Sequence, residues 1–135
     1  MIEAELDRIM IRDMVDVQTV VLKEKDGVRK FPIWIGTNEA QAISRGAKKQ
    51  VPARPLTHEL LSSVIARLDG AVERIVISDL VDNTFFAQVF IRHNGDLVTV
   101  DSRPSDAIAL AMLAEAPIYV EEGVFDQVCR LRTPE

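Results

Sequence analysis

Two turn signals in the second half of the chain constrain its fold more than any other feature. Asp82-Asn83 and the run His93-Asn94-Gly95-Asp96 separate segments rich in β-branched and aromatic residues. Asn and Gly tolerate the positive φ angles of tight hairpin turns, so such sequences typically join antiparallel strands. The sequence therefore predicts three successive antiparallel strands, over Val72 to Leu80, Thr84 to Arg92 and Leu97 to Asp101.

The N-terminal third also has strand character. Apolar and acidic residues alternate from Ile2 to Asp7, which is the two-residue period of a half-buried strand. Two further runs, Gln18 to Leu22 and Phe31 to Ile35, flank the turn-like Lys25-Asp26-Gly27 and predict a hairpin. Because Pro32 lacks a backbone N–H, its strand is expected at a sheet edge or at a bulge.

Helical patterns lie between and after these strands. Asn38 and Gln41 resemble a capping pair for a helix that ends near Lys49. Thr57 is expected to cap a second helix, which has one apolar face and stops at Gly70. The remaining predicted elements are a helix from Pro104 to Glu115, a strand from Ile118 to Val120 and an amphipathic turn or two from Val124 to Leu131.

Together these patterns predict an α+β fold, with a mixed, largely antiparallel sheet and about three helices packed against it. The 135 residues are expected to form a single domain over residues 1–135, since a chain of this length buries roughly two-thirds of its unfolded surface. The only cysteine, Cys129, has no second thiol with which to form an intrachain disulfide.

Charge and hydropathy limit the partners of the chain. Sixteen basic and twenty-one acidic residues give a net charge of −5, which argues against tight, charge-driven binding of nucleic acid and requires any such contact to be local. Aromatic residues are 5% of the chain, too few for an extended stacking platform. With no apolar run near the ~20 residues of a membrane span and no basic, apolar leader at the start, a cytoplasmic protein without membrane contact is expected.

The richest polar cluster is Asp101-Ser102-Arg103-Pro104-Ser105-Asp106, where a strand is expected to end and a helix to begin. Backbone N–H groups at a helix start attract anions, so Arg103 is a candidate phosphate ligand, and Asp101 or Asp106 a candidate metal ligand or proton acceptor. The alternative is local capping by Ser102, Ser105 or Asp106, with Arg103 paired to a carboxylate.

A second helix start, Arg54-Pro55-Leu56-Thr57-His58-Glu59, has a similar pattern. His58 and Glu59 are adjacent, so their side chains point about 100° apart on a helix and do not share a metal as an i, i+4 pair does. His58 is a candidate general base if another segment supplies its partner. The alternative is an ordinary hydrogen-bonded residue in the first turn of the helix.

Two other features allow both a functional and a structural interpretation. Asp79 and Asp82 flank the first hairpin turn, and acidic pairs near strand ends often hold Mg²⁺ or Mn²⁺, although aspartates are also common in turns. Trp34, in an apolar strand, is expected in the core or at a protein interface. P-loop, GxGxxG, HExxH, GxSxG and CxxC patterns are absent, which disfavours the enzyme classes that they mark.

The chain nevertheless resembles the bifunctional nuclease family, also called the DNase/RNase domain. Five blocks carry the resemblance in order: FPIWIGTNEAQAI (31–43), RPLTHELL (54–61), ISDLVDNTFFAQV (77–89), DSRPSDAIALA (101–111) and PIYVEEGV (117–124). The second block more usually has THDL, where this chain has Glu59. The ordered set, and RPSDAIALA above all, is specific to the family.

The resemblance implies a nuclease that degrades DNA and RNA with little sequence preference and that forms a homo-oligomer, most simply a dimer. The hypothesis that follows is metal-assisted hydrolysis with a divalent ion such as Mg²⁺ or Mn²⁺. Its candidate residues are His58, Asp101 and Asp106 for catalysis, Arg54, Arg103, Ser105 and Thr57 for phosphate binding, and Asp79, Asp101 and Asp106 for the metal.

Two other classes remain open from the sequence. The helix starts also suit a non-enzymatic regulatory module that binds an anion or a partner protein, which fits the acidic net charge. A purely structural subunit would be favoured if Trp34 and its strand proved to be buried between chains.

Overall fold

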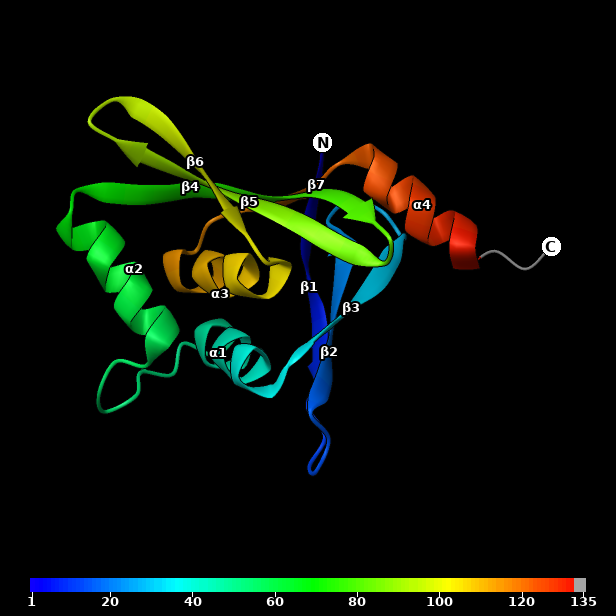
Figure 1. Ribbon diagram of the computed structural model, residues 1–135, viewed down its shortest axis with the longest axis horizontal. Helices are drawn as coiled ribbons and strands as arrows, with labels where there is room; N and C mark the ends of the chain where they lie inside the picture. Colours follow the sequence, from blue (N-terminus) through cyan, green and yellow to red (C-terminus); the bar gives the residue numbers. More distant parts are fainter. Residues whose placement is uncertain (133–135) are drawn as a thin grey trace.

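A seven-stranded mixed sheet in the order β3-β2-β1-β7-β4-β5-β6 organises the computed structural model, which describes the backbone of residues 1–132 and the side chains of residues 1–129 (Figure 1). Residues 133–135 of the predicted domain lie outside the described part. The strands are β1 (Ile2–Met10), β2 (Val17–Glu24), β3 (Lys30–Gly36), β4 (Gly70–Val81), β5 (Thr84–His93), β6 (Asp96–Ser102) and β7 (Ile118–Val120). The helices are α1 (Thr37–Ala47), α2 (Thr57–Arg67), α3 (Pro104–Ala114) and α4 (Glu122–Arg132).

The two hairpins predicted in the second half of the chain form as expected, and so does the β2–β3 hairpin. Asp82 and Asn83 have φ angles of 51° and 63°, and Asn94 and Gly95 have 50° and 84°, so each turn has two successive residues in the left-handed region. These turns join β4, β5 and β6 into a continuous antiparallel set. Register shifts in β4 between Val72 and Arg74 and between Ile77 and Asp79 mark irregularities of the bulge type, which bend and twist a strand.

β1, β2 and β3 form a second antiparallel set, and their strands run across those of β4–β6 in Figure 1. β3 is an edge strand, as its proline predicted. The short β7 joins the two sets, antiparallel to β1 and parallel to β4, which confirms the predicted mixed, largely antiparallel sheet. Trp34 of β3 is 66% exposed, so the prediction that it lies in the core was wrong.

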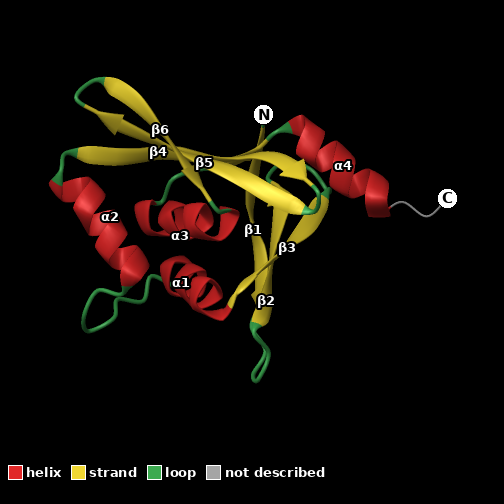
Figure 2. Ribbon diagram, viewed as in Figure 1, coloured by secondary structure: helices red, strands yellow, loops and turns green. Residues whose placement is uncertain are grey.

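α1, α2 and α3 lie together on one side of the curled sheet, whereas α4 packs apart from them against β3 and β4 (Figure 2). α3 is the most central, because residues 107–111 are all buried. The sequence predicted about three helices; the described chain has four, since the expected last turns extend into a helix that begins at Glu122, directly after β7. Among residues 1–132, no helix is long and apolar enough to cross a bilayer.

The predicted side-chain caps were wrong. The N-caps of α1, α2 and α3 are Gly36, Leu56 and Arg103, and none of these residues makes a side-chain cap hydrogen bond. Asn38 and Thr57 do not cap because α1 and α2 begin earlier than expected, which places both residues inside a helix. At α3, Pro104 supplies the preset φ angle of a first helical residue.

Candidate functional site

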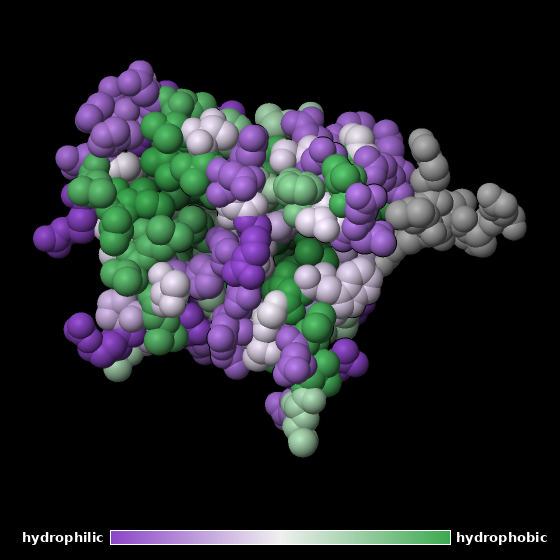
Figure 3. All heavy atoms as spheres, in the orientation of Figure 1, coloured by the Kyte–Doolittle hydropathy of each residue, from purple (hydrophilic) through white to green (hydrophobic). Residues whose placement is uncertain are grey.

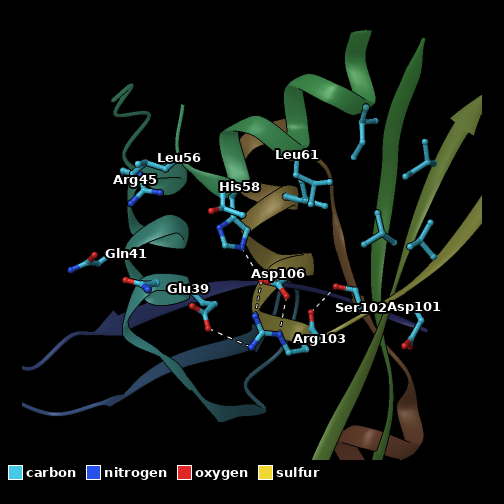
Figure 4. A pocket seen from close by; sticks show the side chains of 17 residues that line it. Glu39, Gln41, Arg45, Leu56, His58, Leu61, Asp101, Ser102, Arg103 and Asp106 are labelled. Carbon is cyan, nitrogen blue, oxygen red and sulfur yellow. Dashed lines mark hydrogen bonds and ion pairs between the residues drawn. The ribbon is translucent and has the colours of Figure 1, made fainter. Parts of the chain in front are cut away.

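A cleft of about 960 Å³ opens where the three clustered helices meet β5 and β6 (Figure 4). One side is polar and comes mainly from α1, the start of α2, the end of β6 and the start of α3. The other side is aliphatic. The polar lining residues are Asn38, Glu39, Gln41, Arg45, Thr57, His58, Asp101, Ser102, Arg103 and Asp106, and the apolar ones are Leu56, Leu61, Ile65, Val89, Ile91, Val100 and Leu110.

Asp106 is the centre of the polar side. Its Oδ1 lies 2.8 Å from Nε2 of His58, which is 48 residues away in sequence and is the second residue of α2. Arg103 donates from Nε to Oδ2 of Asp106 at 2.9 Å and from a terminal nitrogen to Oδ1 at 3.3 Å. A further Arg103 nitrogen lies 3.5 Å from a carboxylate oxygen of Glu39 on α1. The fold therefore joins residues of three helices in one charged cluster.

The charges in this cluster keep Asp106 and Arg103 ionised. Burial acts to raise the pKa of Asp106, but hydrogen bonds from Arg103 and His58 outweigh burial and hold that pKa below its usual value. The Asp106 hydrogen bond, with the negative charges of Asp106 and Glu39, raises the pKa of Arg103. The Arg103 side chain remains 67% exposed, so a fixed positive charge faces the cleft and is open to an anion.

A second ion pair fastens α2 to α1. Arg45 donates from Nε and a terminal nitrogen to the two carboxylate oxygens of Glu59, at 3.1 and 3.3 Å. The hydrogen bond from Arg45 lowers the pKa of Glu59, which therefore stays charged. All eleven residues of α2 remain partly or fully exposed, and its polar contacts at Glu59 and His58 supplement the packing of Ile65 against the core. Glu59 therefore has a structural role as the ion-pair partner of Arg45, and it is not one of the candidate metal ligands.

The structure separates the predicted site residues into two groups. Thr57, His58, Asp101, Arg103 and Asp106 all line the cleft. The others do not: Arg54 is exposed in the loop before α2, Ser105 is buried beside a neighbouring hollow, and Asp79 is exposed on β4, where its Oδ1 accepts a hydrogen bond from the backbone N–H of Leu80.

The local-capping alternative for residues 101–106 is right in one part only. Arg103 does pair with a carboxylate, as that alternative required. The side chains of Ser102, Ser105 and Asp106 do not cap α3, because Arg103 is the N-cap. The Ser102 hydroxyl instead donates to the carbonyl of Arg103 at 2.8 Å.

Sequence reasoning missed two contributors from α1. Glu39 has no role in the sequence-based hypothesis, yet it is an ion-pair partner of Arg103. Arg45 is likewise absent from that hypothesis, although it lines the cleft and donates to Glu59. The available signal was the position of Glu39 within the first block of the family resemblance, next to a helix start.

The described residues of the cleft do not bring together the donor set that a divalent ion needs. Among the described residues, no group of three or more His, Cys, Asp or Glu side chains is arranged to hold a metal. Both oxygens of Asp106 already accept hydrogen bonds from His58 and Arg103, which leaves Asp101 as the exposed carboxylate of the candidate pair in the cleft. The arrangement shown is therefore not a preformed metal cage.

These features define an α+β domain with an aspartate, histidine and arginine cluster at the mouth of a half-apolar cleft. A sequence model of the bifunctional nuclease domain matches residues 20–131, and the chain belongs to this family.

Similarity to three other proteins agrees with this family assignment. An uncharacterized protein of Mycobacterium tuberculosis is 42% identical over 108 residues, which are 80% of this chain and 64% of the relative. Bifunctional nuclease 1 of Arabidopsis thaliana is 28% identical over 107 residues, or 76% of this chain and 33% of the plant protein. Bifunctional nuclease 1 of Oryza sativa subsp. japonica is 22% identical over 120 residues, or 86% and 36%. The chain thus spans less than two thirds of each of these relatives.

Proposed function

We propose that this protein hydrolyses phosphodiester bonds in DNA and RNA, with little sequence preference. The observation that carries the proposal is the contact of His58 and Arg103 with the same carboxylate, Asp106, at the mouth of the cleft. Because Asp106 holds both residues, a general base, His58, lies close to a phosphate ligand, Arg103. This arrangement suits the attack of water on a bound phosphodiester. Membership of the nuclease family and the names of the plant relatives support the same chemistry.

In the proposed reaction, Arg103 binds the phosphate. Its guanidinium presents several donors in a plane, which matches two phosphate oxygens. Phosphate is common to every nucleotide, so a site that reads it through Arg103 has little reason to distinguish bases. The same positive charge stabilises the extra negative charge that develops on the phosphorane oxygens in the transition state.

His58 acts as the general base. When its Nε2–H donates to Asp106, its Nδ1 keeps a lone pair and accepts a proton from the attacking water. The water oxygen forms a bond to phosphorus, the bond to the leaving oxygen breaks, and that oxygen takes a proton from solvent. The charge of Asp106 stabilises the imidazolium until His58 returns its proton to solvent.

Metal assistance by Mg²⁺ or Mn²⁺ remains part of the proposal, with the exposed Asp101 of the cleft as the residue that would hold the ion. A bound ion would supply Lewis-acid activation of the phosphate. None of the steps above depends on it. If cleavage is lost in excess chelator and returns when Mg²⁺ or Mn²⁺ is added, metal assistance is supported. If cleavage is unchanged in chelator, metal assistance is rejected.

The proposal is tested by cleavage of a fluorescently labelled oligonucleotide with purified variants. Arg103→Ala is expected to lower kcat/KM by roughly 10²-fold or more, as for loss of one transition-state ligand. Arg67→Ala, which removes the same charge from the exposed end of α2, is the control. Arg54→Ala tests the predicted second phosphate ligand. Equal cleavage by Arg103→Ala and the control would contradict the proposal and indicate a contaminating nuclease.

A regulatory module that binds a partner protein is the second candidate. The aliphatic side of the cleft favours it, because a polyanion makes little use of such a surface. Salt dependence separates the two candidates: a phosphodiesterase that neutralises phosphates binds oligonucleotides less tightly as salt rises. A flat salt response together with no cleavage would favour the partner-binding module.

A further inference from the structure

A second hollow, of about 500 Å³, lies beside the cleft, and Arg103 lines both. The second hollow lies among the end of β3, the turn between β4 and β5 and the start of α3. The residues that matter for its chemistry are Trp34, Asn83, Thr84, Phe85, Arg103 and Ser105. A group bound here would therefore be next to the proposed phosphate ligand.

Trp34 is the unusual residue of this hollow. It is the chain's single tryptophan, and it is 66% exposed although its neighbours Ile33 and Ile35 are buried. The alternation of a strand explains why Trp34 faces outward, but it does not explain why an indole occupies a solvent-facing position. Exposed tryptophans are typical of surfaces that bind another ring or another molecule.

Basic residues lie near Trp34 in two directions. Arg103 lines the second hollow with it, and Arg8 and Lys30 share with it a smaller hollow of about 270 Å³ on the β1–β3 set. Lys30 lies 3.8 Å from Asp7, and both of these side chains remain partly exposed. An aromatic ring between cationic groups is the pattern that binds single-stranded nucleic acid, where bases stack and phosphates pair with the cations.

We infer that Trp34 and the hollow beside Arg103 form a subsite for one nucleobase, next to the phosphodiester bond that is cleaved. The inference rests on the proposed function. The base stacks on the indole of Trp34, while the Asn83 amide and the Thr84 hydroxyl provide polar groups for its edge. A single aromatic residue makes a site for one base, which is compatible with the low aromatic content of the chain.

The subsite selects single-stranded or frayed substrates. In a duplex both faces of each base are covered by its neighbours, so a base reaches Trp34 only after it has left the stack. Stacking on an aromatic side chain is expected to strengthen binding roughly 5- to 150-fold. Every base has a flat aromatic face, so this contact adds strand preference without strong sequence preference.

The test uses the full chain and two probes, an oligothymidylate of about eight nucleotides and an abasic backbone of equal length. The His58→Ala background prevents cleavage during the binding measurement. Because the chain has one tryptophan, its fluorescence reports directly on Trp34. Affinity is measured separately by anisotropy of end-labelled probes for Trp34→Ala, for the conservative Trp34→Phe, and for Phe86→Ala, an exposed aromatic control outside both hollows around Trp34.

The expected result is quenching of Trp34 fluorescence by oligothymidylate, with much weaker quenching by the abasic probe. Trp34→Ala should lose roughly 5- to 150-fold in affinity for oligothymidylate and little for the abasic probe, with Trp34→Phe in between and Phe86→Ala unchanged. Equal affinity for both probes, or no effect of Trp34→Ala, would overturn the subsite while Arg103→Ala still tests the proposed function.

Two other results are also decisive. Failure of both probes to bind would reject the proposed function itself. Fluorescence that changes with protein concentration and not with oligothymidylate would place Trp34 in an interface between copies of the chain, and would overturn the nucleobase subsite.

Discussion

The carboxylate of Asp106 serves two partners in this site. One oxygen faces the His58 ring from α2, and both accept from Arg103. An asparagine would keep the shape but would lose the charge that offsets Arg103 and stabilises a protonated His58. The negative charge of Asp106 therefore positions both the proposed general base, His58, and the proposed phosphate ligand, Arg103.

Asp106→Asn is expected to lower stability at neutral pH by about 1–3 kcal/mol, the usual range for hydrogen bonds to charged groups. The pKa of Asp106 is lowered in the folded state, so its contribution is present above the unfolded pKa of roughly 3.9 and is lost as pH falls through the lower folded value. Urea unfolding at pH 7 and near pH 3 should show the difference between wild type and Asp106→Asn narrowing in acid. A difference that stays constant with pH would contradict this role.

At the scale of elements, the contact between α1 and α3 depends on a glycine. Gly46 is buried, and a Cβ built on it would lie 2.8 Å from Cβ of Met112 in α3. From sequence alone, a glycine near the end of a helix indicates only a weaker last turn. The structure shows that the missing side chain permits close approach of the two helices that position Glu39 and Asp106.

Gly46→Ala is expected to destabilise the protein by up to about 2 kcal/mol, because an overpacking cost of about 1–3 kcal/mol outweighs the ~1 kcal/mol that alanine gains in helix propensity. Gly123→Ala in α4 is the matched control, since a Cβ there meets no atom within 4 Å. This control is expected to be neutral or stabilising. Urea unfolding of both variants makes the comparison, and a stabilised Gly46→Ala would show that the helices separate at little cost.

Local sequence signals predicted most of the helices and strands. They could not predict the site, because its residues meet through long-range contacts. The Asp82-Asn83 and Asn94-Gly95 turns fixed three strands, because their φ angles depend on the residues themselves. The apolar face of α2 suggested burial, yet Leu60, Val64 and Leu68 are exposed. The contact of His58 with Asp106 spans 48 residues, so no local pattern could reveal it.

At the scale of the whole molecule, apolar side chains gather over α2 and the β4–β6 set (Figure 3). Exposed apolar residues here are Leu60 and Val64 on α2, Leu68 directly after α2, and Val98 and Val100, which share one face of β6. Patches of this kind mark interaction surfaces, and a twofold dimer places the same patch on both partners. We propose that a second copy covers this face in the homodimer that the family resemblance implies.

Sedimentation velocity should show a dimer for the wild-type chain and a monomer for Leu60→Lys, which introduces an unpaired charge into the apolar face. Val28→Lys, at an exposed position in the turn between β2 and β3, should leave the dimer intact. A monomeric wild-type chain, or dimers of equal stability in both variants, would reject this surface.

The proposed role of His58 is tested by single-turnover cleavage of a labelled oligonucleotide with the variant His58→Ala. His93→Ala is its control, because His93 is the chain's other histidine and lies at a hairpin away from the cleft. If His58 is the general base held by Asp106, His58→Ala should cleave about 10²- to 10⁴-fold more slowly, whereas His93→Ala should match wild type. Equal rates for the two variants would contradict the account.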